Sequence, residues 1–405
     1  TSKLLIKKID LVIFEEEPHQ ASDYVIYTLC KHLDIQTIVF VRTVNMMGIL
    51  PMNHFESGCP PLNKIYARKL EDIQHGRHTE ISPIVEDYFT LLNADYEDVL
   101  GIHLWDQVDE LSKRNSLSTP FTNILPMIRG VKKNVAIQSR LRMLFRYKDS
   151  DQKETNKSIY ESNQSYLKTL MYKIVTNFKK KQIKKCYGSL SRRQVNKNGK
   201  YVFCALQYQP EKSTSPLGGV FVNQSLMVAT LSKSLPSDWT LVVKEHPSQF
   251  VSNYTRYGEQ SRSKRFYENL IKYKNVQLAN MSEDVFALID NAQAVASVGG
   301  TICWEAIARG RPALNFAKTW FSGCEGVFFI DSTVSLDSAL KKILNGFAVE
   351  ELKVKAFAQA IVDLGLSDAA VGGHLQLKHH NISASDNARL HEKAVGILQE
   401  GPRNV

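Results

Sequence analysis

The sequence lacks the usual marks of secreted, membrane-spanning and metal-binding proteins. Its six cysteines form no Cys-X-X-Cys pair, which argues against a zinc site or disulfide framework and favours reduced thiols in the cytosol. No apolar run reaches the roughly 18 residues of a membrane span, and no signal-peptide pattern opens the chain. HExxH, P-loop and Gly-X-Gly-X-X-Gly motifs are also missing. We therefore expect a cytoplasmic protein whose site uses no metal and no bound cofactor.

Acidic residues are scarce between Arg129 and Lys200. This basic block holds 20 lysines and arginines against four acids, a net +16 within a chain of net charge +10. Such a block predicts a polyanionic partner: nucleic acid, an anionic bilayer surface or an acidic substrate. The alternative is a solvated helical surface. Asp149 and Asp151 spell Asp-X-Asp inside the block, but no strand precedes them, so we interpret them as a loop and not as a metal site.

The chain divides into two α/β domains and a helical tail. Residues 9–14 and 35–41 are strand-like and flank a helical pattern at 21–33, which indicates a βαβ unit. Pro51, Pro83 and Pro120 interrupt helical patterns further on. Strand-like runs at 201–207, 240–243, 275–279, 294–298 and 312–316 alternate with helical runs, which predicts a doubly wound sheet. We expect domains at 1–195 and 196–345, with helices in 346–405 bracing the first domain.

Three ionisable residues follow a strand of the second domain. "TLVV" (240–243) leads directly into Lys244, Glu245 and His246, and Pro247 ends the run. In a doubly wound sheet, ligands bind beyond the carboxyl ends of the strands. A lysine and a histidine at that edge could hold a phosphate and stabilise charge on a leaving group. The alternative is a structural histidine that bonds a neighbouring loop.

A second group of candidates lies in "SVGGTICWEAIARG". The strand ends, two glycines allow a tight turn, and a helix begins near Thr301, whose free N–H groups suit a phosphate. A tight structural turn is the alternative. The candidate ligands here are Ser297, Gly299, Gly300, Thr301 and Glu305. Ser282, which we expect to cap the helix in "SEDVFALIDNA" that begins directly after it, is also a candidate nucleotide-binding residue.

Two further loops carry polar candidates. Gln209 and Glu211 follow the first strand of the second domain, and Glu17 and His19 follow the first strand of the chain. Each loop could instead be ordinary surface. His374, His379 and His380 lack metal-ligand spacing, and we interpret them as surface residues.

The segments "LQYQPEKSTSPLGGVFVNQ", "VVKEHPSQF" and "NVQLANMSEDVFALIDNAQAVASVGGTICWEAIARGRPAL" resemble the bacterial capsule polysaccharide synthesis family, which includes Kdo transferases. The resemblance implies a GT-B-like fold of two Rossmann-like domains with a cleft between them. It also implies a CMP-activated sugar as donor. The family's His-Pro pair corresponds to His246 and Pro247, and its Gln-Pro motif to Gln209 and Pro210. Its small-residue turn and helix-borne glutamate correspond to the Ser297–Glu305 stretch.

The resemblance implies transfer of an ulosonic acid, Kdo or a nonulosonate, to a surface-polysaccharide or lipid-linked glycan. Glu211 would be the nucleophile of a retaining enzyme, and His19 or Glu17 the base of an inverting one. The basic block would bind an anionic membrane, which makes the protein peripheral to the inner membrane. One alternative is a polyol-phosphate transferase that uses a CDP-alcohol. Another is a nucleic-acid-binding protein, which we disfavour because the block lacks a recognised motif, so we expect no nucleic acid partner.

Overall fold

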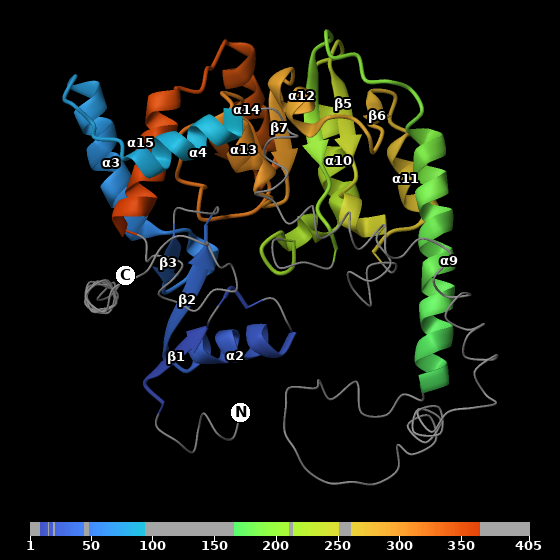
Figure 1. The fold of residues 1–405 in the computed structure, drawn as a ribbon, viewed down its shortest axis with the longest axis horizontal. Helices are drawn as coiled ribbons and strands as arrows, with labels where there is room; N and C mark the ends of the chain where they lie inside the picture. Colours follow the sequence, from blue (N-terminus) through green and yellow to red (C-terminus); the bar gives the residue numbers. More distant parts are fainter. Residues whose placement is uncertain are drawn as a thin grey trace, which may run out of the picture.

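The computed structural model describes residues 9–14, 16–18, 21–43, 48–93, 166–209, 214–250 and 261–364. They form two sheets (Figure 1). The first sheet has the order β1-β2-β3, with strands Leu11–Phe14, Gln36–Arg42 and Ile49–Met52. α2 (Ala21–His32) joins β1 to the parallel strand β2, so the expected βαβ unit is confirmed.

Proline shapes this first part of the chain in two ways. Pro60 and Pro83 begin helices α3 (Pro60–Gln74) and α4 (Pro83–Asn93), because proline fits the first helical turn. Pro51, which we interpreted only as an interruption, lies inside β3 and pairs with Phe40 of β2 in antiparallel register. β3 is an edge strand, where a missing N–H costs no ladder bond.

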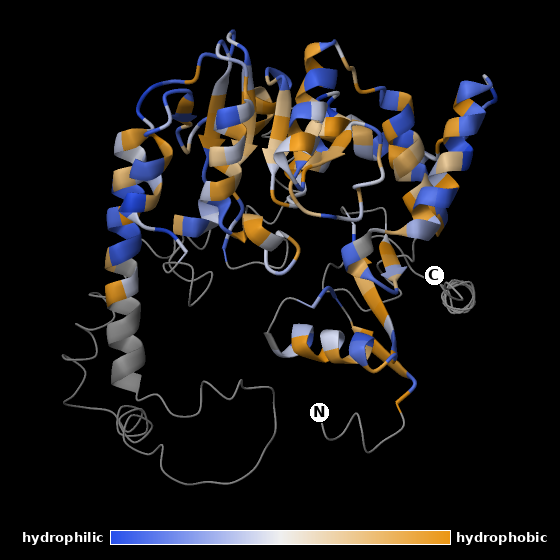
Figure 2. Ribbon diagram, turned by 180° about the vertical axis from the view of Figure 1, so that it is seen from behind, coloured by the Kyte–Doolittle hydropathy of each residue, from blue (hydrophilic) through white to orange (hydrophobic). Residues whose placement is uncertain are grey.

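The second sheet has six parallel strands in the order β6-β5-β4-β7-β8-β9. This is the doubly wound order, which reverses between β4 and β7, so the α/β class predicted from the sequence is confirmed. Hydrophobic residues concentrate in these strands (Figure 2). The strands are β4 (Tyr201–Ala205), β5 (Thr240–Lys244), β6 (Val276–Leu278), β7 (Ala294–Ser297), β8 (Ala313–Asn315) and β9 (Val327–Phe329).

Helices cover both faces of the second sheet. On one face lie α9 (Tyr166–Leu190), α10 (Gln224–Ser234), α11 (Lys264–Leu270) and α14 (Thr333–Leu344). On the other lie α12 (Val285–Asp290) and α13 (Ile302–Ala308), and α15 (Glu351–Leu364) follows at the end of the described chain. Short 3-10 turns are η1 (Phe55–Ser57), η3 (Gly219–Val222) and η4 (Pro247–Phe250). The expected cap of α12 was wrong: Asp284, not Ser282, accepts from the N–H groups of Phe286 and Ala287. None of the described helices combines the length and apolarity needed to cross a bilayer.

Two helices connect distant parts of the chain. α9 carries the end of the basic block, yet its Ile183 and Tyr187 lie in the core of the second sheet. Packing therefore groups α9 with the second sheet, although the boundary expected at residue 195 put it in the first domain. α15 packs against α3 and α4, with the rings of Phe357 and Tyr66 centred 5.0 Å apart.

Candidate active site

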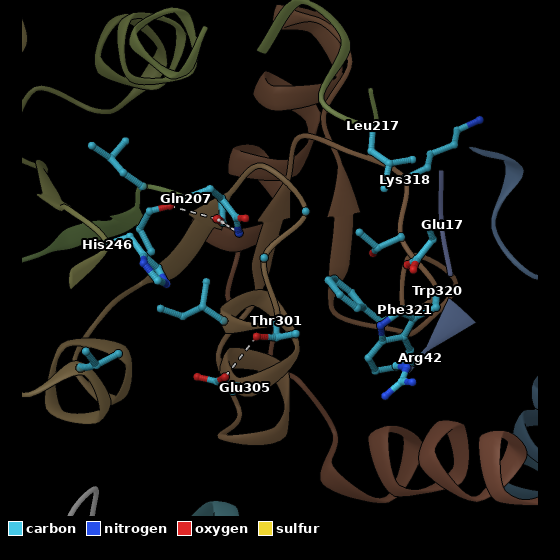
Figure 3. Close-up of a pocket in the computed structure, with 18 of the residues that line it drawn as sticks. Glu17, Arg42, Gln207, Leu217, His246, Thr301, Glu305, Lys318, Trp320 and Phe321 are labelled. Carbon is cyan, nitrogen blue, oxygen red and sulfur yellow. Dashed lines mark hydrogen bonds between the residues drawn. The ribbon is translucent and has the colours of Figure 1, made fainter. Parts of the chain in front are cut away.

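A cavity of about 330 Å³ lies at the carboxyl ends of β4, β5, β7 and β8 (Figure 3). It opens where the strand order reverses, the usual place for a ligand in a doubly wound sheet. The segment around the first sheet completes the opposite wall with Glu17, Val41, Arg42, Met52 and Phe55. The cavity therefore lies between two α/β units, and the expected GT-B-like arrangement is confirmed. Within the described residues, the first unit shows one parallel βαβ unit plus the antiparallel β3.

The tripeptide Lys244-Glu245-His246 sends its three side chains in three directions. Glu245 turns into the protein, where its side chain is 0% exposed beside Arg262, which is 1% exposed. Its Oε2 accepts from Arg262 Nε at 2.5 Å and from the Tyr267 hydroxyl at 2.7 Å. Its Oε1 accepts from the backbone N–H of His246 at 2.8 Å. A buried carboxylate is tolerated here because it has both a cation and several donors.

Arg262 ties this carboxylate to the loop after β4. Its guanidinium donates to Gln209 Oε1 at 2.7 Å and to the carbonyl of Gln207 at 3.0 Å. The side chain of Gln209 is itself buried and also donates to the carbonyl of Val222. Gln209 lies outside the lining of the cavity, and its contacts give it a supporting position behind the site.

Lys244 lies along the cavity with its ammonium directed at backbone. Nζ donates to the carbonyls of Asn280, Met281 and Glu283 at 3.1, 2.9 and 2.5 Å. Burial lowers the pKa of this lysine to about 8, an effect that the nearby Glu283 and Asp284 carboxylates oppose. The three protons of the ammonium are thus directed at carbonyl oxygens, and not at the space where a phosphate would bind.

His246 is the member of the tripeptide whose ring faces the cavity (Figure 3). The backbone N–H of Ser248 donates to its Nδ1 at 3.3 Å. Because a backbone N–H can only donate, the neutral ring carries its proton on Nε2. Burial lowers the pKa of His246 to about 4, so the ring is neutral at physiological pH. His246 therefore presents a neutral N–H donor.

The turn after β7 is built around close backbone approach. Gly299 has φ +77°, which favours glycine, and its N–H donates to Asn315 Oδ1 at 2.9 Å. A Cβ on Gly300 would lie 1.8 Å from Gln207 Nε2. That amide donates to Ser297 Oγ at 3.2 Å, and Ser297 Oγ donates to the Ala205 carbonyl at 2.9 Å. Glycine at 300 lets Gln207 cross the switch point of the sheet.

Glu305 occupies the floor of the cavity on α13 (Figure 3). Thr301 Oγ1 donates to its Oε1 at 3.5 Å. Burial raises the pKa of the Glu305 carboxyl to about 7, because the hydrogen bond from Thr301 and the charge of Arg309 offset only part of the desolvation. The carboxyl can therefore be protonated or charged near neutral pH.

The structure gathers most of the predicted candidates in one cavity. The lining contains Glu17, Lys244, His246, Pro247, Ser297, Gly299, Gly300, Thr301 and Glu305. Ser282 lies away from it, exposed, with its N–H and hydroxyl on Asn280 Oδ1. His19 and Glu211 lie outside the described residues, as do Asp149, Asp151 and the three C-terminal histidines. Among the residues that are described, no three His, Cys, Asp or Glu side chains are grouped to hold a metal ion.

Several lining residues were not named from the sequence. Arg42 ends β2, and Lys318, Trp320 and Phe321 follow β8. Gln207, which we expected to alternate with Gln209 and Glu211 after β4, also lines the cavity. All of them obey the strand-end rule that identified Lys244 and His246, so the signal was present. Arg262 obeys no such rule, because it lies on an irregular segment before α11.

The comparisons give one family. Residues 133–328, just under half of the chain, match the model of the capsule polysaccharide biosynthesis protein family. This match confirms the resemblance stated from the sequence. No curated protein matches the sequence significantly.

Solved structures match with low similarity. The beta Kdo 2,7 transferase KpsC of Thermosulfurimonas dismutans is 15% identical with a TM-score of 0.27, over 49% of this chain and 58% of that one. The UDP-GlcNAc 2-epimerase of Methanocaldococcus jannaschii, in complex with UDP-GlcNAc and UDP, is 14% identical with a TM-score of 0.27, over 49% and 52%. Anabaena Alr3699/HepE, in complex with UDP and glucose, is 14% identical with a TM-score of 0.28, over 52% of each chain. The matches span little more than half of each relative, and likenesses at this level carry no argument about activity.

Proposed function

Because the chain resembles the capsule polysaccharide biosynthesis family over residues 133–328, we propose that it is a glycosyltransferase of surface-polysaccharide synthesis. It transfers an ulosonic acid, Kdo or a nonulosonate, from a CMP-sugar to a glycan or lipid-linked acceptor, without a metal ion. The observation that carries the proposal is the cavity between two α/β units, with His246 directed into it from the end of β5.

His246 serves the donor half of this reaction. When the bond between the sugar and CMP breaks, negative charge grows on the departing phosphate. A neutral Nε2–H donor, held by Ser248 and Glu245, stabilises that charge without first losing a proton. Pro247 fixes the backbone directly after the ring.

Glu17 and Glu305 supply carboxyl groups to the cavity from different elements (Figure 3). Glu17 comes from the segment after β1 and is our candidate base on the acceptor side, together with His19. Glu305 lies in the part of the cavity that binds the donor. The turn that binds the nucleotide there is formed by Ser297, Gly299, Gly300 and Thr301. Glu211 stays our candidate nucleophile if the reaction retains configuration.

A thermal-shift panel of CMP, CDP, UMP, UDP and GDP tests the donor, because a ligand of the native state raises its melting temperature. We expect CMP to give the largest shift. A larger shift with CDP, together with phosphodiester products, would favour a polyol-phosphate transferase instead.

Loss of the His246 donor should reduce turnover by about 100- to 1,000-fold, by analogy with oxyanion-hole deletions. The comparison is His246→Ala against His75→Ala, an exposed histidine on α3's carboxyl end. Equal turnover in the two variants would remove His246 from the mechanism.

The basic block binds the protein to an anionic membrane in this proposal, so the enzyme works in the cytoplasm at the inner membrane. Its described part supports this: Lys179, Lys181, Lys184 and Lys185 are exposed on α9, and Phe178 beside them is 62% exposed. Each lysine near such a surface contributes about 1 kcal/mol of binding. Co-sedimentation with vesicles containing anionic lipid should fall strongly when these four lysines become glutamine. Equal binding to neutral vesicles would contradict the electrostatic role.

A further inference from the structure

We infer that Lys244 is a positioning residue that holds one wall of the cavity, and that it does not itself bind the donor phosphate. The inference deepens the proposed function, and the ligand-binding experiment described below rests on that function.

The geometry of the ammonium group carries the first step. An ammonium has three protons and no acceptor. Within the part of the chain that the structure describes, the hydrogen bonds of Lys244 Nζ all go to backbone carbonyls, those of Asn280, Met281 and Glu283. The side chain is 5% exposed. A phosphate could accept a hydrogen bond from this group only by replacing one of these partly buried carbonyls as the acceptor, and that carbonyl would then lose its partner.

The three carbonyls belong to one turn, and that turn leads into the cavity wall. The last pair between β5 and β6 is Val243 with Leu278, followed by one backbone bond from the Ala279 N–H to the Val243 carbonyl. Lys244 continues this attachment beyond the sheet. Val285 and Phe286, which follow the turn at the start of α12, line the cavity.

The outer side of the same turn has its own supports. The Val195 N–H donates to Glu283 Oε1 at 3.3 Å, and Lys197 lies 3.3 Å from Glu283 Oε2. Asp284 caps α12 locally. These contacts fix the turn to the segment before β4, whereas Lys244 fixes it to β5 on the side of the ligand. Without the ammonium, the turn would keep its contacts with Val195 and Lys197. It would lose the hydrogen bonds from Lys244 that join it to β5 beside the cavity.

The first arm of the test is amide hydrogen exchange of Lys244→Met without ligand. We expect amides of residues 279–290 to exchange about ten-fold faster or more, since each charge-assisted bond contributes measurably to local opening. Amides of β4 should be unchanged. The control is Lys200→Met, an exposed lysine at the opposite end of the sheet whose side chain is 61% exposed. Unchanged exchange at 279–290 would overturn the inference.

The second arm compares CMP with cytidine by calorimetry. If Lys244 is a positioning residue, Lys244→Met should lower the affinity for CMP and for cytidine by the same factor. KM for the donor should rise by a larger factor than kcat falls. A phosphate ligand predicts a loss confined to CMP, and that result would overturn the inference. If the wild type binds neither compound, the proposed function fails. The hydrogen-exchange experiment alone then tests whether Lys244 holds the turn.

Lys244→Arg keeps the experiment decisive if the methionine variant does not fold. A planar guanidinium cannot meet three carbonyls from one point as an ammonium does. We therefore expect exchange at 279–290 between that of the wild type and that of a fully detached turn. Wild-type protection in Lys244→Arg would contradict the role assigned to the ammonium.

Discussion

The buried pair of Glu245 and Arg262 makes the sharpest quantitative prediction. Both side chains are almost completely removed from solvent, at 0% and 1% exposure. Arg262→Met would leave a carboxylate buried with neutral donors only. Breaking a buried ion pair from one side costs about 3–5 kcal/mol, since the remaining charge keeps its desolvation penalty.

That cost is large compared with the whole stability of a domain, which is about 5–15 kcal/mol. For a domain of this size it lowers Tm by about 10 °C. Glu245→Gln should be destabilising for the same reason, because it strands the guanidinium. The double variant should lose less than the sum of the single losses, since neither charge then remains unpaired.

Urea unfolding, followed by the fluorescence of the buried Trp239 and Trp304, measures these losses. The matched control is the surface pair of Lys200 and Asp238, whose side chains are both 61% exposed at 3.4 Å. Breaking that pair should cost less than about 1 kcal/mol. A cost below about 1 kcal/mol for Arg262→Met, or additive losses in the double variant, would refute the reasoning.

Three further predictions concern single residues of the site and its support. Gly300→Ala should cut turnover, because the new Cβ must displace the Gln207 amide 1.8 Å away; Gly188→Ala, with open space around it, is the control in the same assay. Glu305→Gln should remove a pH dependence of stability: the folded carboxyl keeps its proton up to about pH 7 and the unfolded one releases it near 4.5, so wild-type stability falls with rising pH across this window. A flat difference between wild type and variant from pH 4 to about 8 would contradict this. Tyr187→Phe should cost about 1–3 kcal/mol in urea unfolding, since its hydroxyl bonds two buried backbone groups, and an unchanged midpoint would count against it.

The strand-end rule explains how much of the site was accessible from the sequence. Alternation of strands and helices predicted the second sheet, and parallel strands bring their carboxyl ends to one edge, so Lys244, His246 and Ser297 meet there. The rule places a residue at the edge and does not say which way its side chain points. Lys244 turned to carbonyls and Gln209 to a buried arginine, because distant segments supplied better partners than a ligand would.

Other features depend on contacts that no local pattern encodes. Arg262 pairs with Glu245, which lies 17 residues earlier in the sequence, and no periodic pattern predicts this contact. β3 contains a proline and is stable only because its partner strand β2 supplies the ladder. α9 was grouped by its charge, whereas its position follows from two apolar residues, Ile183 and Tyr187, on its inner face.

The hydroxyl of Tyr187 gives α9 a second significance. It donates to the Ala279 carbonyl at the end of β6 and accepts from the Glu245 N–H at the end of β5, so one atom of α9 joins two strand ends beside the cavity. If a partner bound to α9 changes the affinity for a nucleotide through this joint, the nucleotide must change the affinity for that partner by the same factor. Under the proposed function, donor binding and attachment to a membrane would then be reciprocal, and the protein with bound donor would bind the membrane with a different affinity from the protein without it.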